Sequence, residues 1–388
     1  MKIDAANPRH WLLLLLQGLY TLLAIVLRPL RTPLRPPLVI LYGHQLSGNL
    51  QALYREWQRS GQHQLTFYFL SLDPAYSARL KRAGVQVLQC NLLRDMLKLS
   101  QASAIITDHG LHLMTPLLRF TDILFIDVWH GIPFKGFVPD DFKLQHRYDE
   151  IWVSSPMLKH LYETRFGFRP DQVKALGYAR TDKLFQATGT DSDFRKAATI
   201  PADRKIVLYA PTWQHDDQGR ELFPFGESEH SFIGRLSRQC QACDATLVVR
   251  GHLNARIEPV AFDNVLYCSQ KDFADTEELL LATDVLICDW SSIAFDFLAL
   301  NRPTLFLDVP PPFRHGFSLG AEYRFGRVIT DMDSLLQALI DYLQRPQDYA
   351  HGYANQHRLV IEAAYGTSAG GGASSRQLEH LRNLLSPQ

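Results

Sequence analysis

Two series of short apolar runs, separated by helical stretches, constrain the fold of this chain more than any other feature. The first series reads PLVILYG, QLTFYFLS, VQVLQC, SAIITD, DILFIDVWH and EIWVSS. The second reads KIVLYAPT, ATLVVRGH, NVLYCS, DVLICDWSS and PTLFLD. Strands that alternate with helices at this spacing predict an α/β fold with parallel sheets and helices on both faces. A chain of 388 residues has room for two such domains.

The two series set the expected domain boundaries. We predict one Rossmann-like domain over residues 37–190 and a second over residues 200–345. The polar, weakly patterned stretch 186–204 is interpreted as the linker between them. Residues 346–388 are predicted to form a helical tail, interrupted by YGTSAGGGASS. Its glycines indicate a mobile or closely approached backbone.

Residues 1–36 form a separate N-terminal segment that is apolar from Trp11 to Leu27. A cleaved signal peptide needs small residues after the apolar stretch, and this chain has Arg-Pro-Leu-Arg there. A spanning helix and a buried core helix are both open alternatives for a stretch of this length. Because Gln17, Thr21, Ala24 and Arg28 share one helical face, we favour a helix that lies in the membrane interface.

Composition excludes several classes of partner and site. The 40 basic and 40 acidic side chains balance, so we expect no nucleic-acid partner. Three of the five cysteines lie in or beside apolar runs, a usage that suits a reducing compartment. Cys240 and Cys243 form a lone CxxC without a second ligand pair at zinc spacing, so no metal site is predicted.

The first chemical motif is the histidine that ends the run FIDVWHGIPFKGF. His130 follows a strand directly, with Gly131 beside it and Pro133 fixing the next turn. An imidazole in this position suits proton removal at neutral pH, and Lys135 supplies a nearby cation. The alternative is a histidine that merely hydrogen-bonds at the end of a strand. Asp127 and Lys135 either orient His130 or an acceptor phosphate, or form a surface salt bridge.

Polar residues also end three runs of the second series. Asp289 is followed by Ser291 and Ser292 at the start of a predicted helix, where unpaired N–H groups favour a phosphate, although a simple cap is the alternative. The other two groups are Arg250 with His252, and Pro211 with Thr212. Together they suit a diphosphate bound by the second domain, opposite a base in the first. Asp296 either reaches a ribose hydroxyl or pairs with a buried arginine.

Four ordered motifs resemble one known family. DVWHGIPFKGF, LGYARTDKLF, LYAPTW and DVLICDWSSIAFDFLALNRPTLFL are similar to the successive motifs of the bacterial CDP-glycerol glycerophosphotransferases, the teichoic-acid-type polyol-phosphate transferases. The likeness runs from about residue 100 to 310 and extends to Arg376. It implies a GT-B architecture of two Rossmann-like domains that face a cleft. It also implies an enzyme associated with the cytoplasmic face of the bacterial inner membrane.

The resemblance implies a reaction and roles for particular residues. Glycerol phosphate passes from CDP-glycerol to a hydroxyl of a membrane-linked acceptor and CMP is released, with no tightly bound cofactor. His130 is expected to be the base and His252 to stabilise the phosphate. Asp289 to Ser292 and Arg376 are expected to contact the donor. The donor-binding group also includes residues described above, namely Arg250, Thr212, Pro211 and Asp296. We place Gly131, Lys135, Arg180 and Asp182 on the acceptor side.

Some positions depart from the family pattern. Ile132 stands where the family has Thr, Trp290 where it has Tyr, and Gly251-His252-Leu253 where it has Leu-His-Pro. These changes leave open whether the polyol is glycerol or ribitol, which acceptor is used, and whether one unit or a polymer is added. A nucleotide-sugar transferase of the same fold and an inactive scaffold are the alternative functions.

Overall fold

The computed structural model describes residues 6–31, 34–61, 64–212, 224–251, 262–269 and 272–386. The chain divides into two units, each built around one parallel sheet. The first unit comprises Met1–His130, Pro139–Arg180 and Gly372–Gln388. The second comprises Gly131–Val138 and Thr181–Gly371. The chain therefore passes from one unit to the other four times, and His130 is the last residue before the first passage.

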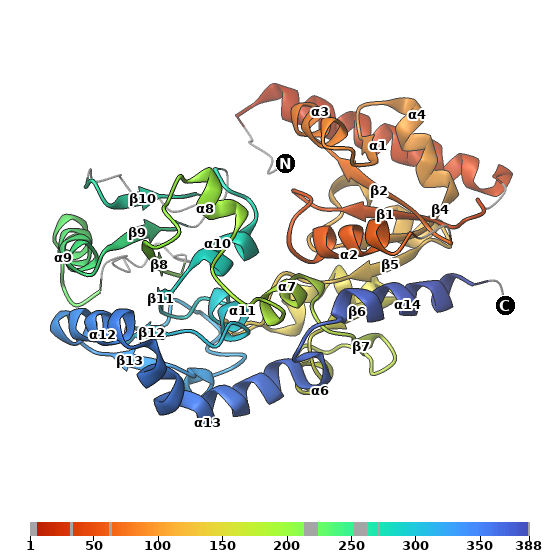
Figure 1. Cartoon of the computed structure of the whole chain (residues 1–388). Helices are drawn as coiled ribbons and strands as arrows, with labels where there is room; N and C mark the ends of the chain where they lie inside the picture. The colour runs from red at the N-terminus through yellow and green to blue at the C-terminus, as the bar shows by residue number, and fades with distance from the viewer. Residues whose placement is uncertain are drawn as a thin grey trace. The chain divides into compact units, whose positions relative to one another are not determined.

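The first sheet contains seven parallel strands in the order β3-β2-β1-β4-β5-β6-β7 (Figure 1). Its strands are β1 (Leu38–Tyr42), β2 (Thr66–Ser71), β3 (Val87–Gln89), β4 (Ala102–Thr107), β5 (Leu124–Asp127), β6 (Glu150–Val153) and β7 (Val173–Ala175). All six predicted strands of the first series are present. The seventh, β7, was not predicted because it is three residues long and lacks an apolar run.

Helices cover both faces of this sheet, as the alternating pattern predicts. They are α1 (Pro8–Leu27), α2 (Gly48–Arg59), α3 (Pro74–Arg82), α4 (Leu93–Met96), α5 (Leu117–Phe120), α6 (Pro156–Thr164) and α14 (Ala373–Leu385). Short 3-10 helices span Arg28–Leu30, Leu97–Gln101, His112–Met114, Pro139–Phe142 and Gln145–Arg147. Leu50 and Leu53 of α2 and Leu381 of α14 share a core with Val39 and Leu41 of β1. This core lies on one face of β1. Tyr42 points to the opposite face, because side chains alternate along a strand.

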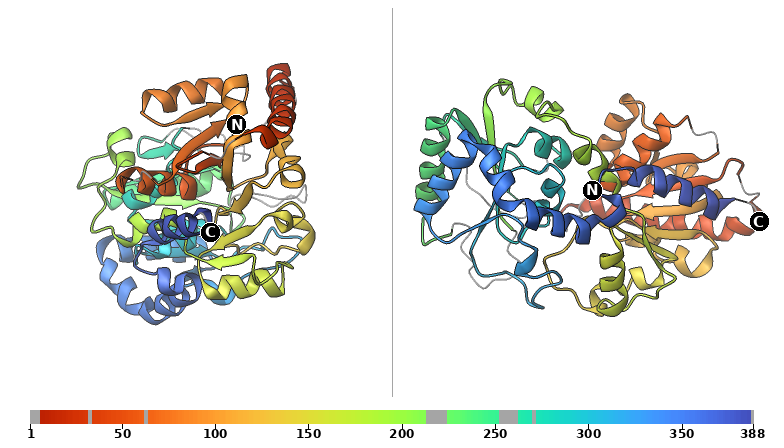
Figure 2. Two further views of the ribbon diagram at one scale, coloured as in Figure 1. Left: turned by 90° about the vertical axis from the view of Figure 1, so that its right-hand side faces the viewer. Right: turned by 60° about the horizontal axis from the view of Figure 1, so that its bottom comes forward.

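The N-terminal helix α1 packs on this unit through its polar stripe. Leu14, Gln17, Thr21 and Ala24 are buried, and the Gln17 amide donates a hydrogen bond to the Tyr42 hydroxyl at 3.0 Å. Leu12, Leu15, Leu19, Leu22 and Leu23 are exposed, and the left view of Figure 2 shows the red helix at the periphery of the unit. Only 22% of its most apolar stretch is buried, so most of this stretch lies outside the core of the unit.

The second sheet contains six parallel strands in the order β10-β9-β8-β11-β12-β13. The strands are β8 (Lys205–Ala210), β9 (Ala245–Val249), β10 (Val265–Tyr267), β11 (Val285–Cys288), β12 (Thr304–Leu307) and β13 (Arg327–Ile329). The five predicted strands of the second series are all present. The sixth, β13, is another three-residue strand without a strong apolar run.

The helices of the second unit are α7 (Asp182–Phe185), α8 (Asp193–Ala197), α9 (Glu229–Ala242), α10 (Thr276–Ala282), α11 (Ile293–Leu298), α12 (Met332–Gln344) and α13 (Pro346–Tyr365). Its 3-10 helices are Ala179–Thr181, which straddles the boundary, Ala321–Tyr323 and Gly366–Ser368. Residues of α9 and α12, including Phe232, Leu236, Leu335 and Leu339, pack on Val207 and Tyr209 of β8. Apolar side chains from both helices thus bury one face of the sheet.

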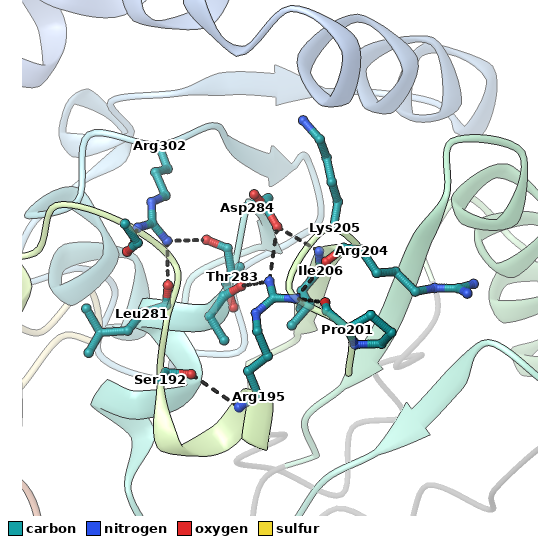
Figure 3. A network of polar contacts seen from close by, with 12 residues as sticks. Ser192, Arg195, Pro201, Arg204, Lys205, Ile206, Leu281, Thr283, Asp284 and Arg302 are labelled. Carbon is teal, nitrogen blue, oxygen red and sulfur yellow. Dashed lines mark hydrogen bonds and ion pairs between the residues drawn. The ribbon is translucent and has the colours of Figure 1, made fainter. Parts of the chain in front are cut away.

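The stretch 186–204, predicted as a linker, is bound firmly to the second unit. Arg195 of α8 donates to the carbonyl oxygens of Pro201 and Arg204 at 2.6 and 2.7 Å, and its other terminal nitrogen lies 3.9 Å from Asp284 (Figure 3). Arg302 binds Gly189 O at 2.7 Å. The contact of Arg195 with Asp284 and the hydrogen bond from Arg302 join the segment to the rest of the unit, and the ring of Phe194 packs on that of Phe273 with centroids 5.0 Å apart.

The C-terminal tail, predicted as a helical segment over 346–388 with a break at its glycines, consists of α13 and α14, which belong to different units. In α13 the Tyr365 hydroxyl donates to Phe295 O at 2.8 Å, within the second unit. In α14 the Gln377 amide donates to Gly177 O at 2.6 Å, within the first. Gly370, Gly371 and Gly372 join them with φ values of 98, 97 and 79°, a region that favours glycine.

Candidate active site

Each sheet reverses its strand order at one point, and several predicted site residues follow strands at or next to that point in their own sheet. The first sheet reverses between β1 and β4, and the second between β8 and β11. In open α/β sheets the carboxyl ends of strands at such a point form the ligand-binding crevice. His130 follows β5, which neighbours β4, while Thr212 and Asp289 follow β8 and β11.

Four histidines gather at the carboxyl ends of the first sheet's central strands. His44 follows β1, His109 and His112 follow β4, and His130 follows β5. The ring centroids of His44 and His109 are 4.6 Å apart, and those of His109 and His130 are 5.1 Å apart. The Nδ1 atom of His112 lies 2.7 Å from the Tyr42 hydroxyl. The predicted base is therefore one member of a continuous imidazole cluster.

The His130 ring has a defined tautomer. Its Nδ1 atom lies 3.2 Å from the backbone oxygen of Asp108, which only accepts, so Nδ1 carries the proton and Nε2 has a free lone pair. Loss of hydration among surrounding protein atoms, together with His109, lowers the pKa of His130 to about 4. The side chain still has an exposed surface. At neutral pH it is thus an accessible neutral imidazole.

Asp108 and His109 form a dyad beside this ring. The Nδ1 atom of His109 donates to Asp108 Oδ1 at 2.6 Å. Burial lowers the pKa of His109, but the charge and hydrogen bond of Asp108 outweigh it, and the net pKa is raised. Gly43 makes room for the carboxylate, since a Cβ there would lie 2.6 Å from Asp108 Oδ1.

The backbone around His130 is held by buried groups. The Asn49 amide donates to the carbonyl oxygens of Val128 and Trp129 at 2.9 and 3.0 Å, and its oxygen accepts from Arg180 N at 3.1 Å. Arg180 Nη1 donates to His130 O at 2.7 Å. Trp129 has φ +45°, a left-handed conformation that non-glycine residues rarely adopt. These contacts fix the position from which the imidazole projects.

Gly131 and Lys135, predicted on the acceptor side with the first domain, belong to the second unit. Gly136 N donates to Gly316 O at 2.7 Å, and Phe134 packs on Phe295 with ring centroids 4.6 Å apart. The Lys135 ammonium lies 5.0 Å from the Phe137 ring centroid. The placement differs because Ile132 and Phe134 bury their apolar side chains in the second unit.

On the second sheet, Asp289 joins the ends of the two central strands. Its Oδ1 accepts from Thr212 N at 2.8 Å, from the Thr212 hydroxyl, and from Trp290 N at 2.6 Å. The carboxylate is buried, while Pro211 and Thr212 are half-buried. The predicted donor residues Pro211, Thr212 and Asp289 therefore form one connected group.

The predicted helix after Asp289 begins at Ile293, as expected, but α11 has only six residues. Ser291 and Ser292 are half-buried, and the Ser292 side chain makes no capping hydrogen bond to the helix. Asp296 is buried within α11. The helix is short, so its dipole adds little, and local N–H and hydroxyl groups would provide most of the attraction for an anion.

Arg250 follows β9, and its guanidinium contacts protein groups. It donates to the Thr276 hydroxyl at 2.9 Å and to Phe273 O at 3.2 Å, at the start of α10. Burial lowers the pKa of this guanidinium. His252, the second predicted catalytic histidine, lies outside the described residues.

Two further predicted residues fall at the passages between units. Asp182 begins α7 in the second unit, and Arg180 ends a segment of the first. Arg376, predicted on the donor side, lies in the first unit, where its Nε donates to Leu176 O at 3.4 Å. It is placed there because α14 packs on α2.

Sequence reasoning missed Asn49, Asp108 and His109. The last two follow a predicted strand directly in the sequence IITDHG, and a histidine then a glycine after a strand is the same signal that singled out His130. Asn49 gave no such signal, because its role depends on backbone atoms about 80 residues away along the chain. Among the described residues, no group of three or more His, Cys, Asp or Glu is placed to hold a metal ion.

Comparison with known proteins identifies the family. The model of the CDP-glycerol:poly(glycerophosphate) glycerophosphotransferases matches residues 26–370. The chain belongs to this family. It is therefore an enzyme of the glycerophosphotransferase class, as the four motifs indicated. Teichoic acid glycerol-phosphate transferase of Staphylococcus aureus (strain NCTC 8325 / PS 47) is 25% identical over 363 residues, covering 86% of this chain and 89% of that protein.

Other members of the glycerophosphotransferase family are longer. The teichoic acid poly(glycerol phosphate) polymerase of Bacillus subtilis (strain 168) is 26% identical over 290 residues, and the match covers 68% of this chain but 37% of the polymerase. A solved structure of the wall teichoic acid polymerase TagF aligns with a TM-score of 0.73 at 18% identity, covering 97% of this chain and 95% of that one. This likeness confirms the predicted fold of two Rossmann-like domains.

Proposed function

We propose that this enzyme transfers glycerol phosphate, or a related polyol phosphate, from the CDP-linked donor to a hydroxyl of a membrane-linked acceptor. The observation that supports the proposal most is the neutral, accessible imidazole of His130, which follows the strand next to the switch point of the first sheet. An acceptor hydroxyl is a poor nucleophile until its proton is removed, and a positioned base contributes about 10²–10⁴ in rate.

The proposed reaction is an in-line phosphoryl transfer. The acceptor oxygen forms a bond to the phosphorus next to glycerol, its proton passes to Nε2 of His130, and the bond from that phosphorus to the CMP oxygen breaks. CMP leaves, and His130 returns its proton to solvent. The donor substrate supplies all the atoms transferred, so no further cofactor enters this scheme.

We assign donor binding to the polar groups at the switch point of the second sheet. Pro211, Thr212 and Asp289 are fixed in one connected group, and the half-buried Ser291 and Ser292 follow it. Backbone N–H and hydroxyl groups of this kind stabilise charge on phosphate oxygens without reorganising during the reaction. Arg250 and Asp296 are proposed to shape the same region, and His252 and Arg376 to assist the phosphate.

Arg180, Gly131, Lys135 and Asp182 are proposed to position the acceptor. Arg180 is the best supported of these, because its guanidinium is already bound to the backbone oxygen of His130 at 2.7 Å. A side chain that fixes the base also fixes where the acceptor hydroxyl must arrive.

We further propose that α1 attaches the enzyme to the cytoplasmic surface of a bacterial membrane. The helix is long and apolar enough to cross a bilayer by length and composition. Its polar stripe is packed on the first unit, however, so the exposed leucines are free to enter the interface while the helix lies flat. Attachment of this kind would bring a lipid-linked acceptor to the enzyme.

Product analysis tests the function. Purified enzyme is incubated with CDP-glycerol or CDP-ribitol and a membrane lipid extract, and the released nucleotide is measured. We expect CMP and an acceptor extended by a polyol phosphate. Release of a nucleoside diphosphate from a nucleotide sugar, with no turnover of either CDP-polyol, would contradict the proposal. The chain length of the product shows whether one unit or a polymer is added.

A further inference from the structure

A pocket of about 530 Å³ lies at the C-terminal end of α1, far from the histidine cluster. It is lined by Arg28, Pro29 and Arg31, by residues 100–103, and by residues 119–122. The last two segments precede or begin β4 and β5, whereas His109, His112 and His130 follow the other ends of the same strands. The six residues of β4 separate the two regions by roughly 17 Å, since a strand rises about 3.3 Å per residue.

The pocket is cationic, because three arginines face one carboxylate. Arg28 forms a fixed wall: it pairs with Asp122 and donates to Ala102 O at 2.7 Å and Ser100 O at 3.3 Å. The hydrogen bond from Arg28 lowers the pKa of Asp122, so this carboxylate is ionised. Its negative charge is balanced by the positive charge of Arg28. Two positive charges remain in the lining.

Those two charges belong to Arg31 and Arg119. Arg119 is exposed and Arg31 is half-buried. Within the part of the chain that the structure describes, neither guanidinium makes a hydrogen bond or ion pair, and that of Arg119 lies 5.5 Å from the Phe120 ring centroid. A guanidinium presents several N–H donors in a geometry that matches phosphate oxygens. Both therefore keep donors for an anion.

Exposed apolar side chains lie in the pocket lining and next to its arginines in the sequence. Phe120, which lines it, is 59% exposed, and Leu30 and Val26 are 80% and 69% exposed. The exposed face continues along the helix through Leu12, Leu15, Leu19, Leu22 and Leu23. A soluble anion would use the cations and leave these apolar side chains in water. A molecule with a phosphate next to hydrocarbon chains would use both.

We propose that this pocket binds the phosphate of an anionic phospholipid, with the acyl chains lying along the exposed face of α1. The proposal rests on the membrane attachment proposed above and names the lipid class that this attachment selects. Arg31 and Arg119 contact the headgroup phosphate, while Arg28 and Asp122 shape the pocket. The site lies outside the region assigned to the transfer reaction.

Vesicle sedimentation with the full chain tests the site. Wild-type enzyme, the Arg31→Gln/Arg119→Gln variant and the Arg82→Gln/Arg169→Gln variant are each mixed with phosphatidylcholine vesicles, with or without phosphatidylglycerol. The second variant is the control, since it removes the same charge from exposed arginines of the first unit. We expect the pocket variant to bind phosphatidylglycerol vesicles about 30-fold more weakly than wild type, the effect of two interfacial cations. The control should bind like wild type. Equal loss of vesicle binding in both variants would contradict the proposal that this pocket binds the lipid.

Two further measurements separate the possible failures. If wild type binds neither vesicle, or if Leu15→Glu/Leu19→Glu does not release it, the membrane attachment itself is wrong. Calorimetry with short-chain phosphatidylglycerol and with glycerol phosphate identifies the occupant: the lipid should bind more tightly than the free headgroup, and equal binding would mean a soluble anion instead. Release of CMP with a soluble acceptor should be unchanged in the arginine variant, which also shows that it is folded.

Discussion

The imidazole rings of His109 and His130 are stacked, with centroids 5.1 Å apart and 9° between the ring planes. The first ring is bound to a carboxylate and has a raised pKa, whereas the second has a pKa lowered to about 4. Charge on His109 makes charge on His130 unfavourable, so the pair holds one proton donor and one acceptor in adjacent rings. Two similar side chains are thereby given different roles by their surroundings.

Replacing His130 with alanine should reduce the release of CMP from CDP-glycerol about 10²–10⁴-fold, because the acceptor hydroxyl loses its base. The rate is measured with saturating donor and acceptor, and circular dichroism checks the fold. His160→Ala is the matched control, since His160 is an exposed histidine of α6. Full activity in a folded His130→Ala enzyme would remove this residue from the mechanism.

Replacing His109 with glutamine should change the pH dependence more than the maximal rate. The base works only when unprotonated, so activity falls as the pH drops through the pKa of His130, which is about 4 in the wild type. Removing the neighbouring charge raises that pKa, and the acidic limb of kcat/KM should shift to higher pH. A limb that stays in place, or moves to lower pH, would show that the two rings are not coupled.

The buried carboxyl group of Asp127 should make the free energy of unfolding depend on pH. Burial raises the pKa of this carboxyl to about 7, well above its value of about 3.9 in an unfolded chain. The folded state therefore holds a proton that the unfolded state releases, and the wild type should lose stability relative to Asp127→Asn as the pH rises from about 4 to about 7. The slope is at most about 1.4 kcal/mol per pH unit. Urea denaturation at several pH values measures it, with the exposed Asp171→Asn as control.

The Thr212 hydroxyl should matter for binding of the donor. Thr212→Val keeps the shape but removes a hydrogen bond to the buried Asp289 carboxylate, which then disturbs the connection between β8 and β11. We expect about a tenfold loss of CDP-glycerol affinity by calorimetry, the equivalent of one hydrogen bond to a charged group. Thr212→Ser retains the hydroxyl and should bind nearly normally. Loss of affinity in Thr212→Ser with normal binding in Thr212→Val would implicate the methyl group instead.

Arg195 should be a main source of stability for the segment 186–204. Its guanidinium is buried and bound to Pro201 O and Arg204 O, so Arg195→Ala leaves two carbonyl oxygens without their donor. We expect unfolding to become easier by about 2–4 kcal/mol. Lys196→Ala, at an exposed position next in sequence, should change stability by less than about 0.5 kcal/mol. Urea denaturation of the two variants compares them directly.

The parallel strands of both sheets were predictable because fully buried strands appear as continuous apolar runs. Among the strands of the described residues, β7 and β13 were not predicted, since three residues such as Val-Lys-Ala carry no pattern. The same reasoning located His130, Thr212 and Asp289, because polar residues that end apolar runs mark the carboxyl ends of strands.

The assignment of residues 131–138 to the second unit could not be predicted. It depends on Phe134 finding Phe295 and on Ser318 binding the backbone of Phe134 and Lys135, and these partners are more than 150 residues away along the chain. The local sequence shows that Phe134 is apolar, but it does not show whether this side chain packs in the core of the first or of the second unit. The polar stripe of α1 is similar: its period was visible, whereas its contact with Tyr42 required the folded domain.

The direction of α1 has a consequence for how an acceptor is found. The helix meets Tyr42 at the carboxyl end of β1 through Gln17 and reaches Ala102, at the start of β4, through Arg28. Its outer flank thus runs alongside the strands, and an enzyme resting on that flank would hold its central strands level with the bilayer. The lipid-linked acceptor proposed above would then arrive sideways, by diffusing within the leaflet, and the search for it would be confined to two dimensions.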